Sequence, residues 1–506
     1  MSEHRARGKV YLVGAGPGDP GLLTLKAARA IAGCDALVYD YLAAAPIVAL
    51  APDGCEKIYV GKKAGAHTMP QEEINALLVR LAREGKRVVR LKGGDVFVFA
   101  RGAEEAEELF AAGIPFEIVP GISSALAAPA YAGIPLTHRA HNTSFTVATG
   151  HEDPLKGPSS LDFAKLANPS QTLVFLMAMG NLAGIVAQLR LHGLPGAMPV
   201  AIVREGTRPD QETLVATLDT IVSEVQRKNF AAPAIVVIGE VVRERERLRW
   251  FDTGPLFGKK VLVTRPRASA DEFAAKLWEI GAEPMMAPTI AIEPPDDRAA
   301  AEIAMREIRI FHWIVFTSVN GVEAFFDHLG AAGRDARAIG DASVAAIGPK
   351  TAERLRAHGV RADFVPARFV SEEVAAGMLE RTEPGQRILL YTAQEARDVL
   401  PEALRAEGRR VDVVAAYKTS AVRDPAIAER AAEADVWTFT SASAVRAFVD
   451  NVPDAAHLAT ARTVACIGPV TAEAARACGL PVHVTAEEYT VDGLIEALER
   501  TAAPAR

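Results

Sequence analysis

A glycine-rich turn near the N-terminus contains the first residues whose types and spacing could do chemistry. In "VGAGPGDPGLLTLKA", Gly16, Gly18 and Gly21 follow a strand-like run and open a helical pattern, so they match the dinucleotide-binding signature G-x-G-x-x-G. Two prolines in the same turn, Pro17 and Pro20, remove backbone N–H groups that a pyrophosphate would need. The turn therefore favours close approach of the backbone to a ligand other than a dinucleotide.

Two further turns of small residues also follow strand-like runs. Gly93, Gly94 and Asp95 end "RVVRLKGGD", and Ser123 and Ser124 follow "FEIVPGI". Turns at the carboxyl ends of parallel strands meet at one edge of a sheet, where they form a crevice that a flat nucleoside can enter. The sequence therefore predicts a small-molecule site at this edge.

Short apolar strands alternate with helical patterns along the whole chain and must position these turns. Examples are "KVYLVG", "TLVFLM" and "PAIVVIG", and the alternation is typical of α/β layers with largely parallel sheets. The alternation pauses in "RERERLRWFDTGPLF", residues 243–257, where charged residues give way to Gly and Pro. We therefore expect an N-terminal domain over residues 8–250 and a C-terminal domain over residues 258–500.

The second half contains an internal repeat. "IVFTSVNGVEAFFDHL" at 314 returns as "WTFTSASAVRAFVDNV" at 437, and "VAAIGPKTAERLRAHG" at 344 returns as "VACIGPVTAEAARACG" at 464. The strands that open the two copies, in "GKKVLVTRP" at 258 and "GQRILLYTA" at 385, are also alike. We expect each copy to form one small α/β lobe, with a ligand cleft between the two lobes. The repeated "TS" and "IGP" turns place N–H groups at helix starts, which favours an anionic ligand.

The composition argues against several classes of protein. The 506 residues carry a net charge of −7 without a long basic block, which argues against nucleic acid as a partner. No apolar run reaches the roughly 18 residues of a membrane helix, and the N-terminus lacks a signal-peptide pattern. The four cysteines form no CxxC pair, so neither a metal site nor a disulfide framework is indicated. We expect a cytoplasmic protein without a membrane segment or a metal ion.

The first half closely resembles the uroporphyrinogen-III C-methyltransferases of the tetrapyrrole methylase family. The blocks "VGAGPGDPGLLTLKA", "VVRLKGGDVFVFARGAEE", "VPGISSALAAPAYAGIPLTHR" and "PVAIVREGT" stand in the family's order, and the resemblance covers residues 8 to about 250. It implies a two-lobed αβα enzyme that forms a homodimer. Its activity would be the transfer of two methyl groups from S-adenosylmethionine to C2 and C7 of uroporphyrinogen III, which gives precorrin-2.

The resemblance also implies site residues. Asp40 and Lys62 would transfer protons, and the cofactor contacts would be Pro17, Gly93, Gly94, Asp95, Val98, Ser123, Ser124, Met177 and Gly206. Because the substrate is a polycarboxylate, its pocket must be locally basic, and we expect contacts from Lys92, Arg101, His138, Arg139 and Arg204. The chain departs from the family pattern at Val96, Ala100 and Ser124, which concerns loop geometry rather than the type of reaction.

The second half resembles the uroporphyrinogen-III synthases over residues 258–500, through "VLVTRP", "VVAAYKT" and the repeated blocks. The resemblance implies two α/β lobes joined by two connecting strands, and cyclisation of hydroxymethylbilane with inversion of the last ring and without a cofactor. Tyr417 would assist departure of the hydroxyl group, and substrate contacts would come from Arg265, Thr317, Ser318, Thr351, Thr440, Ser441 and Thr471. The product of this half is the substrate of the first, directed toward sirohaem and cobalamin.

Two alternatives from other classes stay open at this point. The first is an NAD-dependent oxidoreductase, which binding of NAD rather than S-adenosylhomocysteine would identify. The second is a tetrapyrrole-binding regulator in which one half has lost its activity.

Overall fold

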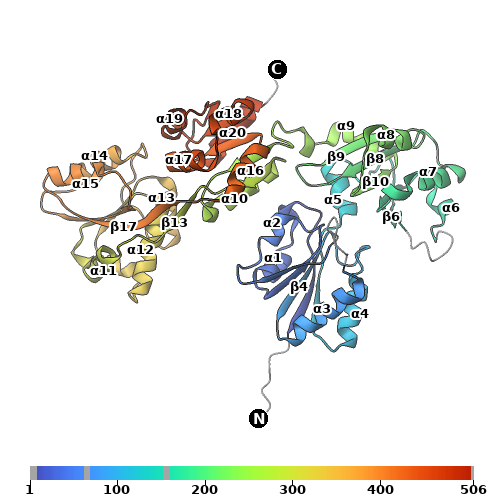
Figure 1. Cartoon of the computed structure of the whole chain (residues 1–506), viewed down its shortest axis with the longest axis horizontal. Coiled ribbons are helices and arrows are strands. Elements are labelled where there is room, and N and C mark those ends of the chain that lie inside the picture. The colour runs from blue at the N-terminus through green and yellow to red at the C-terminus, as the bar shows by residue number, and fades with distance from the viewer. Residues whose placement is uncertain (1–7, 62–68, 152–159, 503–506) are drawn as a thin grey trace, which may run out of the picture.

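Four five-stranded sheets organise the chain in the computed structural model, which describes residues 8–61, 69–151 and 160–502 (Figure 1). Two sheets belong to the N-terminal half and two to the C-terminal half. Helices cover the sheets in both halves, so the predicted α/β fold class is confirmed. Among the described residues, no helix is both long and apolar enough to cross a membrane.

The first sheet is entirely parallel, with the strand order β3-β2-β4-β1-β5. Its strands are β1 (Lys9–Gly14), β2 (Ala36–Tyr39), β3 (Glu56–Tyr59), β4 (Arg87–Lys92) and β5 (Phe116–Val119). The turn η1 (Pro20–Leu22) and the helices α1 (Leu25–Ala32), α2 (Ala45–Val48), α3 (Gln71–Arg83) and α4 (Gly102–Ala111) connect them. The adjacent residues Val88 and Val89 belong to different core clusters, so both faces of the sheet are covered and its strands are continuously apolar.

The second sheet, of order β6-β7-β10-β8-β9, is mixed rather than largely parallel. Its strands are β6 (Phe145–Thr149), β7 (Thr172–Leu176), β8 (Pro199–Arg204), β9 (Glu212–Thr217) and β10 (Ala234–Ile238), and its helices are α5 (Ser124–Tyr131), α6 (Phe163–Leu166), α7 (Leu182–Leu191) and α8 (Ile221–Lys228). Only residues 205–211 join β8 to β9, a connection too short for a parallel crossover. The strands therefore pair as an antiparallel hairpin.

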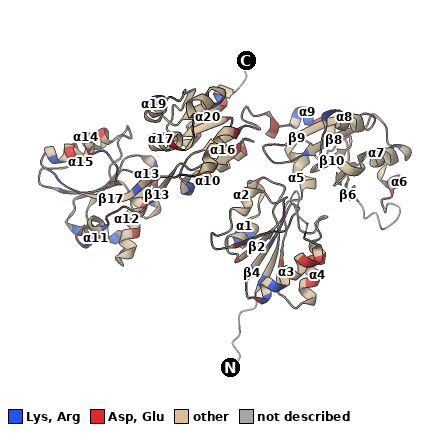
Figure 2. Cartoon of the chain, in the orientation of Figure 1, with Lys and Arg blue, Asp and Glu red and all other residues tan. Residues whose placement is uncertain are grey.

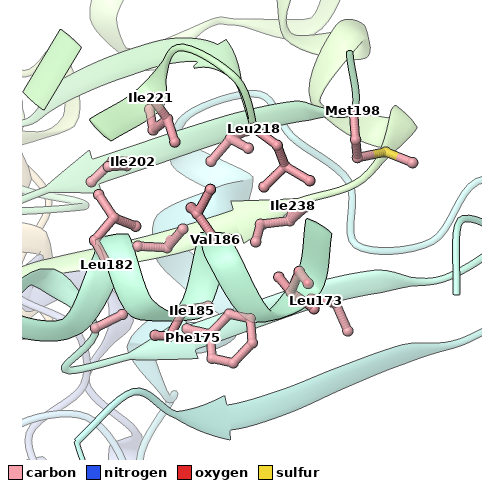
Figure 3. Close-up of a cluster of buried hydrophobic side chains, with 14 of the residues drawn as sticks. Leu173, Phe175, Leu182, Ile185, Val186, Met198, Ile202, Leu218, Ile221 and Ile238 are labelled. Atoms are coloured by element: carbon pink, nitrogen blue, oxygen red, sulfur yellow. The ribbon is translucent and has the colours of Figure 1, made fainter. Parts of the chain in front are cut away.

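Helices α7 and α5 cover opposite faces of this second sheet. Leu182, Ile185 and Val186 of α7 pack on Phe175 and the neighbouring strands, at the spacing of one helical face (Figure 3). The small residues of α5 pack on the other face in a separate cluster. Because α5 begins directly after β5, it connects the two lobes of the N-terminal half.

Two sheets also form the C-terminal half, and one of them is parallel. The parallel sheet has the order β12-β11-β18-β19-β20, and the mixed sheet has the order β13-β17-β16-β14-β15. The strands are β11 (Lys260–Val263), β12 (Glu283–Met286), β13 (Ile290–Glu293), β14 (Trp313–Phe316), β15 (Ser343–Ala346), β16 (Arg387–Ala393), β17 (Arg410–Ala421), β18 (Val436–Phe439), β19 (Thr463–Cys466) and β20 (Val484–Thr485). The antiparallel pair β13 and β17 joins the lobes, as the two connecting strands of the resemblance predict.

Helices cover both C-terminal sheets. They are α10 (Arg267–Glu279), α11 (Ala299–Arg306), α12 (Val319–Ala331), α13 (Pro349–Ala357), α14 (Ser371–Arg381), α15 (Val399–Ala406), α16 (Pro425–Glu433), α17 (Ala442–Asn451), α18 (Ala455–Leu458), α19 (Pro469–Ala477) and α20 (Val491–Ala502). Acidic and basic residues are interspersed over these helices (Figure 2).

The prediction that each repeat copy forms one lobe is wrong. Strands β14 and β15 of the first copy lie in the mixed sheet, whereas β18 and β19 of the second copy lie beside β11. The chain leaves the parallel sheet after β12 and returns to it only after β17. Each lobe therefore combines a strand from the start of one copy with the "TS" and "IGP" segments of the other.

The segment between the halves, residues 245–257, is packed against its surroundings. It contains the short helix α9 (Arg245–Leu248) and the turn η5 (Phe251–Thr253), and it follows the turn η4 (Glu240–Glu244). Phe251 and Leu256 are almost fully buried. We call residues 245–257 the linker.

Candidate active sites

A cavity of about 670 Å³ lies between the two lobes of the N-terminal half. The first lobe lines it with the turns that follow β1, β4 and β5, and the second lobe with the segments after β7 and β8. All nine residues predicted to contact a cofactor line this cavity: Pro17, Gly93, Gly94, Asp95, Val98, Ser123, Ser124, Met177 and Gly206. The structure brings them together from positions almost 190 residues apart (206 − 17 = 189). Their role in binding a cofactor stays a prediction.

Backbone contacts hold the glycine turns of this cavity together. Gly16 and Gly94 exchange two N–H···O hydrogen bonds of 3.1 and 2.7 Å, and Gly94 has a φ of +69°. A Cβ at Gly121 would lie 2.3 Å from the carbonyl oxygen of Gly94, so only glycine fits there. Asp95 accepts hydrogen bonds from the N–H groups of Phe97 and Gly121 at 2.8 and 3.1 Å. These contacts fix three neighbouring strand ends against one another.

Left-handed backbone conformations concentrate around the cavity. Four of the seven non-glycine residues with positive φ among the described residues line it: Phe99, Arg101, Met177 and Glu205. Such conformations cost free energy and persist where the surrounding structure imposes them, commonly at ligand sites. The same region holds a carboxyl group with a perturbed pKa, because burial raises the pKa of Glu205 above its ordinary value.

A buried charge network lies at one end of the cavity. Asp40 Oδ2 is 3.1 Å from Nη2 of Arg90, and Arg90 Nε in turn donates to Oε1 of Glu105 at 3.1 Å. Lys92 Nζ donates to the same carboxylate oxygen at 2.8 Å. Glu105 is fully buried, and burial lowers the pKa of Lys92, with the neighbouring Arg90 adding to the effect. Asp40, Arg90 and Lys92 line the cavity, and Lys62 lies outside the described residues.

The predicted substrate contacts of this half separate into two groups. Lys92 and Arg101 line the cavity, whereas His138, Arg139 and Arg204 do not, and Arg204 forms an ion pair with Glu212. The role of all five in binding substrate stays a prediction.

Two cavity-lining cations were not predicted from the sequence, Arg90 and Arg208. A signal for Arg90 exists, because it is a charged residue inside the otherwise apolar run "VVRL".

His138 lies in a cluster with His141 and Glu244. The two imidazole rings are 4.8 Å apart, and Nε2 of His141 is 2.8 Å from Oε1 of Glu244. Arg247 Nη2 is 2.5 Å from the other carboxylate oxygen, and the hydrogen bonds from His141 and Arg247 lower the pKa of Glu244. His138, His141 and Glu244 are close enough together to hold a metal ion. His141 and Glu244 are hydrogen-bonded to each other, and Arg247 connects Glu244 to the linker.

A smaller cavity of about 260 Å³ lies in the C-terminal half, at the carboxyl ends of the strands in the mixed sheet. Thr317 and Tyr417 line it together with Ser371, Gln394 and Arg397, none of which was predicted. Thr317 Oγ1 donates to Thr392 Oγ1 at 3.0 Å, which fixes this wall. Arg397 also lines the cavity; its side chain is largely exposed, and its Nη1 lies 3.3 Å from Oε1 of Glu372.

The other predicted residues of this half lie at strand ends in both lobes. Ser318 and Ser441 cap α12 and α17 by accepting hydrogen bonds from Gly321 N and Ala444 N at 3.0 and 3.1 Å. Thr351 and Thr471 are buried in the first turns of α13 and α19. Arg265 and Thr440 follow β11 and β18, and burial lowers the pKa of Arg265. Thr317, Ser318 and Thr351 belong to one lobe, and the remaining four belong to the other.

Comparison with known proteins identifies both halves. Residues 9–222 match the family model of Tetrapyrrole (Corrin/Porphyrin) Methylases, and residues 271–496 match that of Uroporphyrinogen-III synthase HemD. A "Porphyrin biosynthesis protein HemD" from Ruminiclostridium josui is 40% identical over 495 residues, which cover 97% of each chain. Neither family model describes an NAD-dependent oxidoreductase.

Two further relatives match the N-terminal half. An "S-adenosyl-L-methionine-dependent uroporphyrinogen III methyltransferase" from Methanosarcina barkeri is 53% identical over 247 residues, which are 49% of this chain and 97% of that protein. A "Siroheme synthase" from Azotobacter vinelandii is 52% identical over 249 residues, which are 49% of this chain and 53% of that enzyme. The match therefore spans about half of the siroheme synthase.

Proposed function

Because the chain belongs to the proteins that join a tetrapyrrole methylase to a uroporphyrinogen-III synthase, we propose that it catalyses two consecutive steps of tetrapyrrole synthesis. The synthase half, which we assign to residues 258–500, converts hydroxymethylbilane into uroporphyrinogen III. The methylase half, which we assign to residues 8–250, methylates that product at C2 and C7 and gives precorrin-2. The product of the second half is thus the substrate of the first.

One observation carries the methylase assignment: nine residues from five separate segments converge on a single cavity beside Asp40. Its volume suits a nucleoside-sized ligand, and its lining combines glycine backbone with apolar side chains such as Val98, Met177 and Ile235. These features fit S-adenosylmethionine, which supplies an electrophilic methyl group when bound. Pro17, the Gly93–Asp95 turn and Gly206 would hold it.

The protein's own contribution is to orient the tetrapyrrole and to move protons. Asp40 directly follows β2 and lines the cavity, and its carboxylate is positioned to take the proton that a methylated pyrrole carbon must lose. Arg90 Nη2 lies 3.1 Å from Asp40 Oδ2 and fixes the position of this carboxylate at the cavity. Arg101 and Arg208, which also line the cavity, would pair with substrate carboxylates.

The synthase half works by binding and folding its substrate. Helix starts after β14, β15, β18 and β19 direct N–H groups from both lobes toward carboxylates of the linear tetrapyrrole. Drawing the two ends of this chain together accounts for ring closure without a cofactor. Tyr417 lines the smaller cavity and is the candidate for assisting departure of the hydroxyl group.

We also propose an oligomeric state, a cellular location and an end product. The methylase half forms a homodimer, for which Leu25, Phe97 and Phe110 offer exposed apolar side chains. The protein acts in the cytoplasm, in keeping with its four free cysteines. Sirohaem is one end product, in keeping with the 52% sequence identity between the methylase half and the siroheme synthase of Azotobacter vinelandii.

Both activities can be tested in one experiment. The purified chain is given hydroxymethylbilane with and without S-adenosylmethionine, and the products are separated by chromatography. We expect uroporphyrinogen III without the methyl donor and precorrin-2 with it. Spontaneous closure to the type I isomer would contradict the synthase assignment, and failure to methylate added uroporphyrinogen III would contradict the methylase assignment.

Replacing Tyr417 by Phe should lower the synthase rate by about 10- to 100-fold, because a phenyl ring cannot donate a proton to a departing hydroxyl. The measurement is the initial rate of uroporphyrinogen III formation from fresh hydroxymethylbilane. Tyr391→Phe is the control, because Tyr391 is buried in the core of the same lobe, does not line the cavity with Tyr417, and keeps its ring in the variant. Equal rates for both variants would show that the Tyr417 hydroxyl does not take part in the reaction.

A further inference from the structure

Tyr131, the last residue of α5, contacts two parts of the chain. One is the glycine-rich turn beside the cavity of the methylase half, and the other is the linker. Its hydroxyl donates a 2.6 Å hydrogen bond to Oδ2 of Asp19, which is 9% exposed. Asp19 stands two residues after Pro17, a residue of the cavity wall. The other carboxylate oxygen of Asp19 accepts a hydrogen bond from Gly21 N at 2.7 Å and so fixes the turn that follows. The contact therefore holds the glycine-rich turn in place.

Asp19 also joins the two lobes of the methylase half. Its backbone N–H donates to Oγ1 of Thr207 at 3.1 Å, and Thr207 is fully buried next to the cavity residue Gly206. The N–H of Thr207 donates to Gln211 at 2.9 Å, and the side-chain amide of Gln211 donates back to the carbonyl of Tyr131 at 3.4 Å. This ring of hydrogen bonds connects the Pro17 wall of one lobe with the Gly206 wall of the other.

The aromatic ring of Tyr131 packs against the linker. Its centroid is 4.9 Å from the ring of Trp250 and 4.8 Å from that of Phe251, and Trp250 Nε1 donates to the carbonyl of Ala130 at 3.2 Å. Phe251 lies 5.4 Å from Phe257, whose ring would clash with a Cβ at Gly281, between α10 and β12 of the synthase half. Continuous aromatic contacts thus lead from Tyr131 into the first lobe of the synthase.

A second contact supports the same connection. Helix α10 of the synthase half lies against η1, the turn that Asp19 caps. The turn η1 therefore contacts the synthase half directly through α10. It is also connected to that half indirectly, through Tyr131 and the linker.

We propose that Tyr131 is a positioning residue that couples ligand binding in the methylase cavity to the packing of the linker. Its hydroxyl keeps the Pro17 wall and the Gly206 wall of the cavity in a fixed relative position. Its ring couples that position to the packing of Trp250 and Phe251. This inference rests on the proposed methylase function. Coupling between two sites acts in both directions. A ligand that stabilises the closed arrangement of the cavity walls therefore also stabilises the packing of Tyr131 against the linker.

The first measurement is calorimetric binding of S-adenosylhomocysteine to the full-length chain. Tyr131→Phe keeps the ring and removes only the hydroxyl, so we expect the Kd to rise by about tenfold, as for loss of a hydrogen bond to a charged group. Tyr11→Phe is the matched control, since Tyr11 lies on β1 of the same lobe with its ring beside Lys9 and Arg87. It should bind like the unaltered chain.

Kinetics separate positioning from loss of structure. Tyr131→Phe should raise the KM for S-adenosylmethionine by about tenfold and leave kcat for methyl transfer and the synthase rate within about twofold of the unaltered chain. A general loss of fold would instead lower kcat, and a fall in kcat without a rise in KM would overturn the proposal.

Fluorescence tests the coupling to the linker. Trp250 contacts Tyr131, whereas Trp278, Trp313 and Trp437 lie buried within the synthase half. Saturation with S-adenosylhomocysteine should change the emission of the unaltered chain, and the change should be lost in Trp250→Phe.

The outcomes are distinct. If the unaltered chain does not bind S-adenosylhomocysteine, the methylase function itself fails. If it binds and Tyr131→Phe binds equally well, the positioning role fails while the function stands. If Tyr131→Phe weakens binding but saturation leaves Trp250 emission unchanged, the coupling to the linker fails.

Discussion

Replacing Asp40 by Asn should lower the rate of methyl transfer by at least about 100-fold, the lower end of what general acid–base catalysis contributes. The amide keeps the shape of the side chain and cannot accept a proton. Arg90 Nη2 lies 3.1 Å from Asp40 Oδ2 and holds the side chain at the cavity, so the substitution removes a proton acceptor from a fixed position. The measurement is transfer of labelled methyl groups from S-adenosylmethionine to uroporphyrinogen III at saturating concentrations of both.

Two controls locate the effect in the reaction itself. Asp53→Asn changes an exposed carboxylate in the same lobe and should leave methylation unaltered. Asp40→Asn should still bind S-adenosylhomocysteine and convert hydroxymethylbilane at the normal rate, because neither property depends on a proton acceptor at this position. An unchanged methylation rate in Asp40→Asn would assign proton transfer to another group.

Replacing Glu105 by Gln should destabilise the methylase half by about 3–5 kcal/mol, the usual cost of breaking a buried ion pair. Glu105 is fully buried and accepts hydrogen bonds from Arg90, Lys92 and Gln71 at 3.1, 2.8 and 3.1 Å. A neutral amide leaves the buried Lys92 without its ion-pair partner and leaves Arg90 paired with Asp40 alone. Urea unfolding followed by far-ultraviolet circular dichroism should show an earlier transition for the methylase half.

Tryptophan emission offers an internal control for this experiment. When Trp250→Phe is added to every chain compared, the remaining tryptophans, Trp278, Trp313 and Trp437, lie buried in the synthase half, so their emission reports that half. The emission transition of Glu105→Gln should therefore stay close to that of the unaltered chain. Glu107→Gln, an exposed position on the same helix, should move neither transition. Equal transitions for Glu105→Gln and Glu107→Gln would show that the buried network does not stabilise the fold.

The cost of Glu105→Gln should also depend on pH. Burial already lowers the folded-state pKa of Lys92 below its ordinary value of 10.5, and removal of the carboxylate lowers it further. Between the lowered folded-state pKa and 10.5, the unfolded chain binds more protons than the folded chain, so stability rises with pH across this window. The difference between Glu105→Gln and the unaltered chain should therefore shrink as the pH is raised toward 10.5.

The fold class, the division into two halves and the meeting of the glycine-rich turns at one cavity could be predicted from the amino-acid sequence. Turns after parallel strands must meet at one sheet edge, so Pro17, Gly94 and Ser123 could be placed together from local patterns alone. The synthase repeat was equally visible as a repeat. The sequence did not show which strands of the two copies pair with each other. The pairing of β11 with β18 forms only after the chain returns to the parallel sheet through β17.

The charged groups that share a buried site, and the contacts between the two halves, became visible in the three-dimensional structure alone. Arg90, Glu105 and Asp40 are spread over 65 residues (105 − 40 = 65), and they become one network only when β2, β4 and α4 pack together. Tyr131 and Asp19 meet across 112 residues, and Trp250 joins them from the linker. Local sequence patterns report periodicity and turn chemistry, whereas these contacts arise from burial between elements far apart in the chain. For that reason the turns that line the cavity could be predicted, whereas the side chains that hold these turns in place could not.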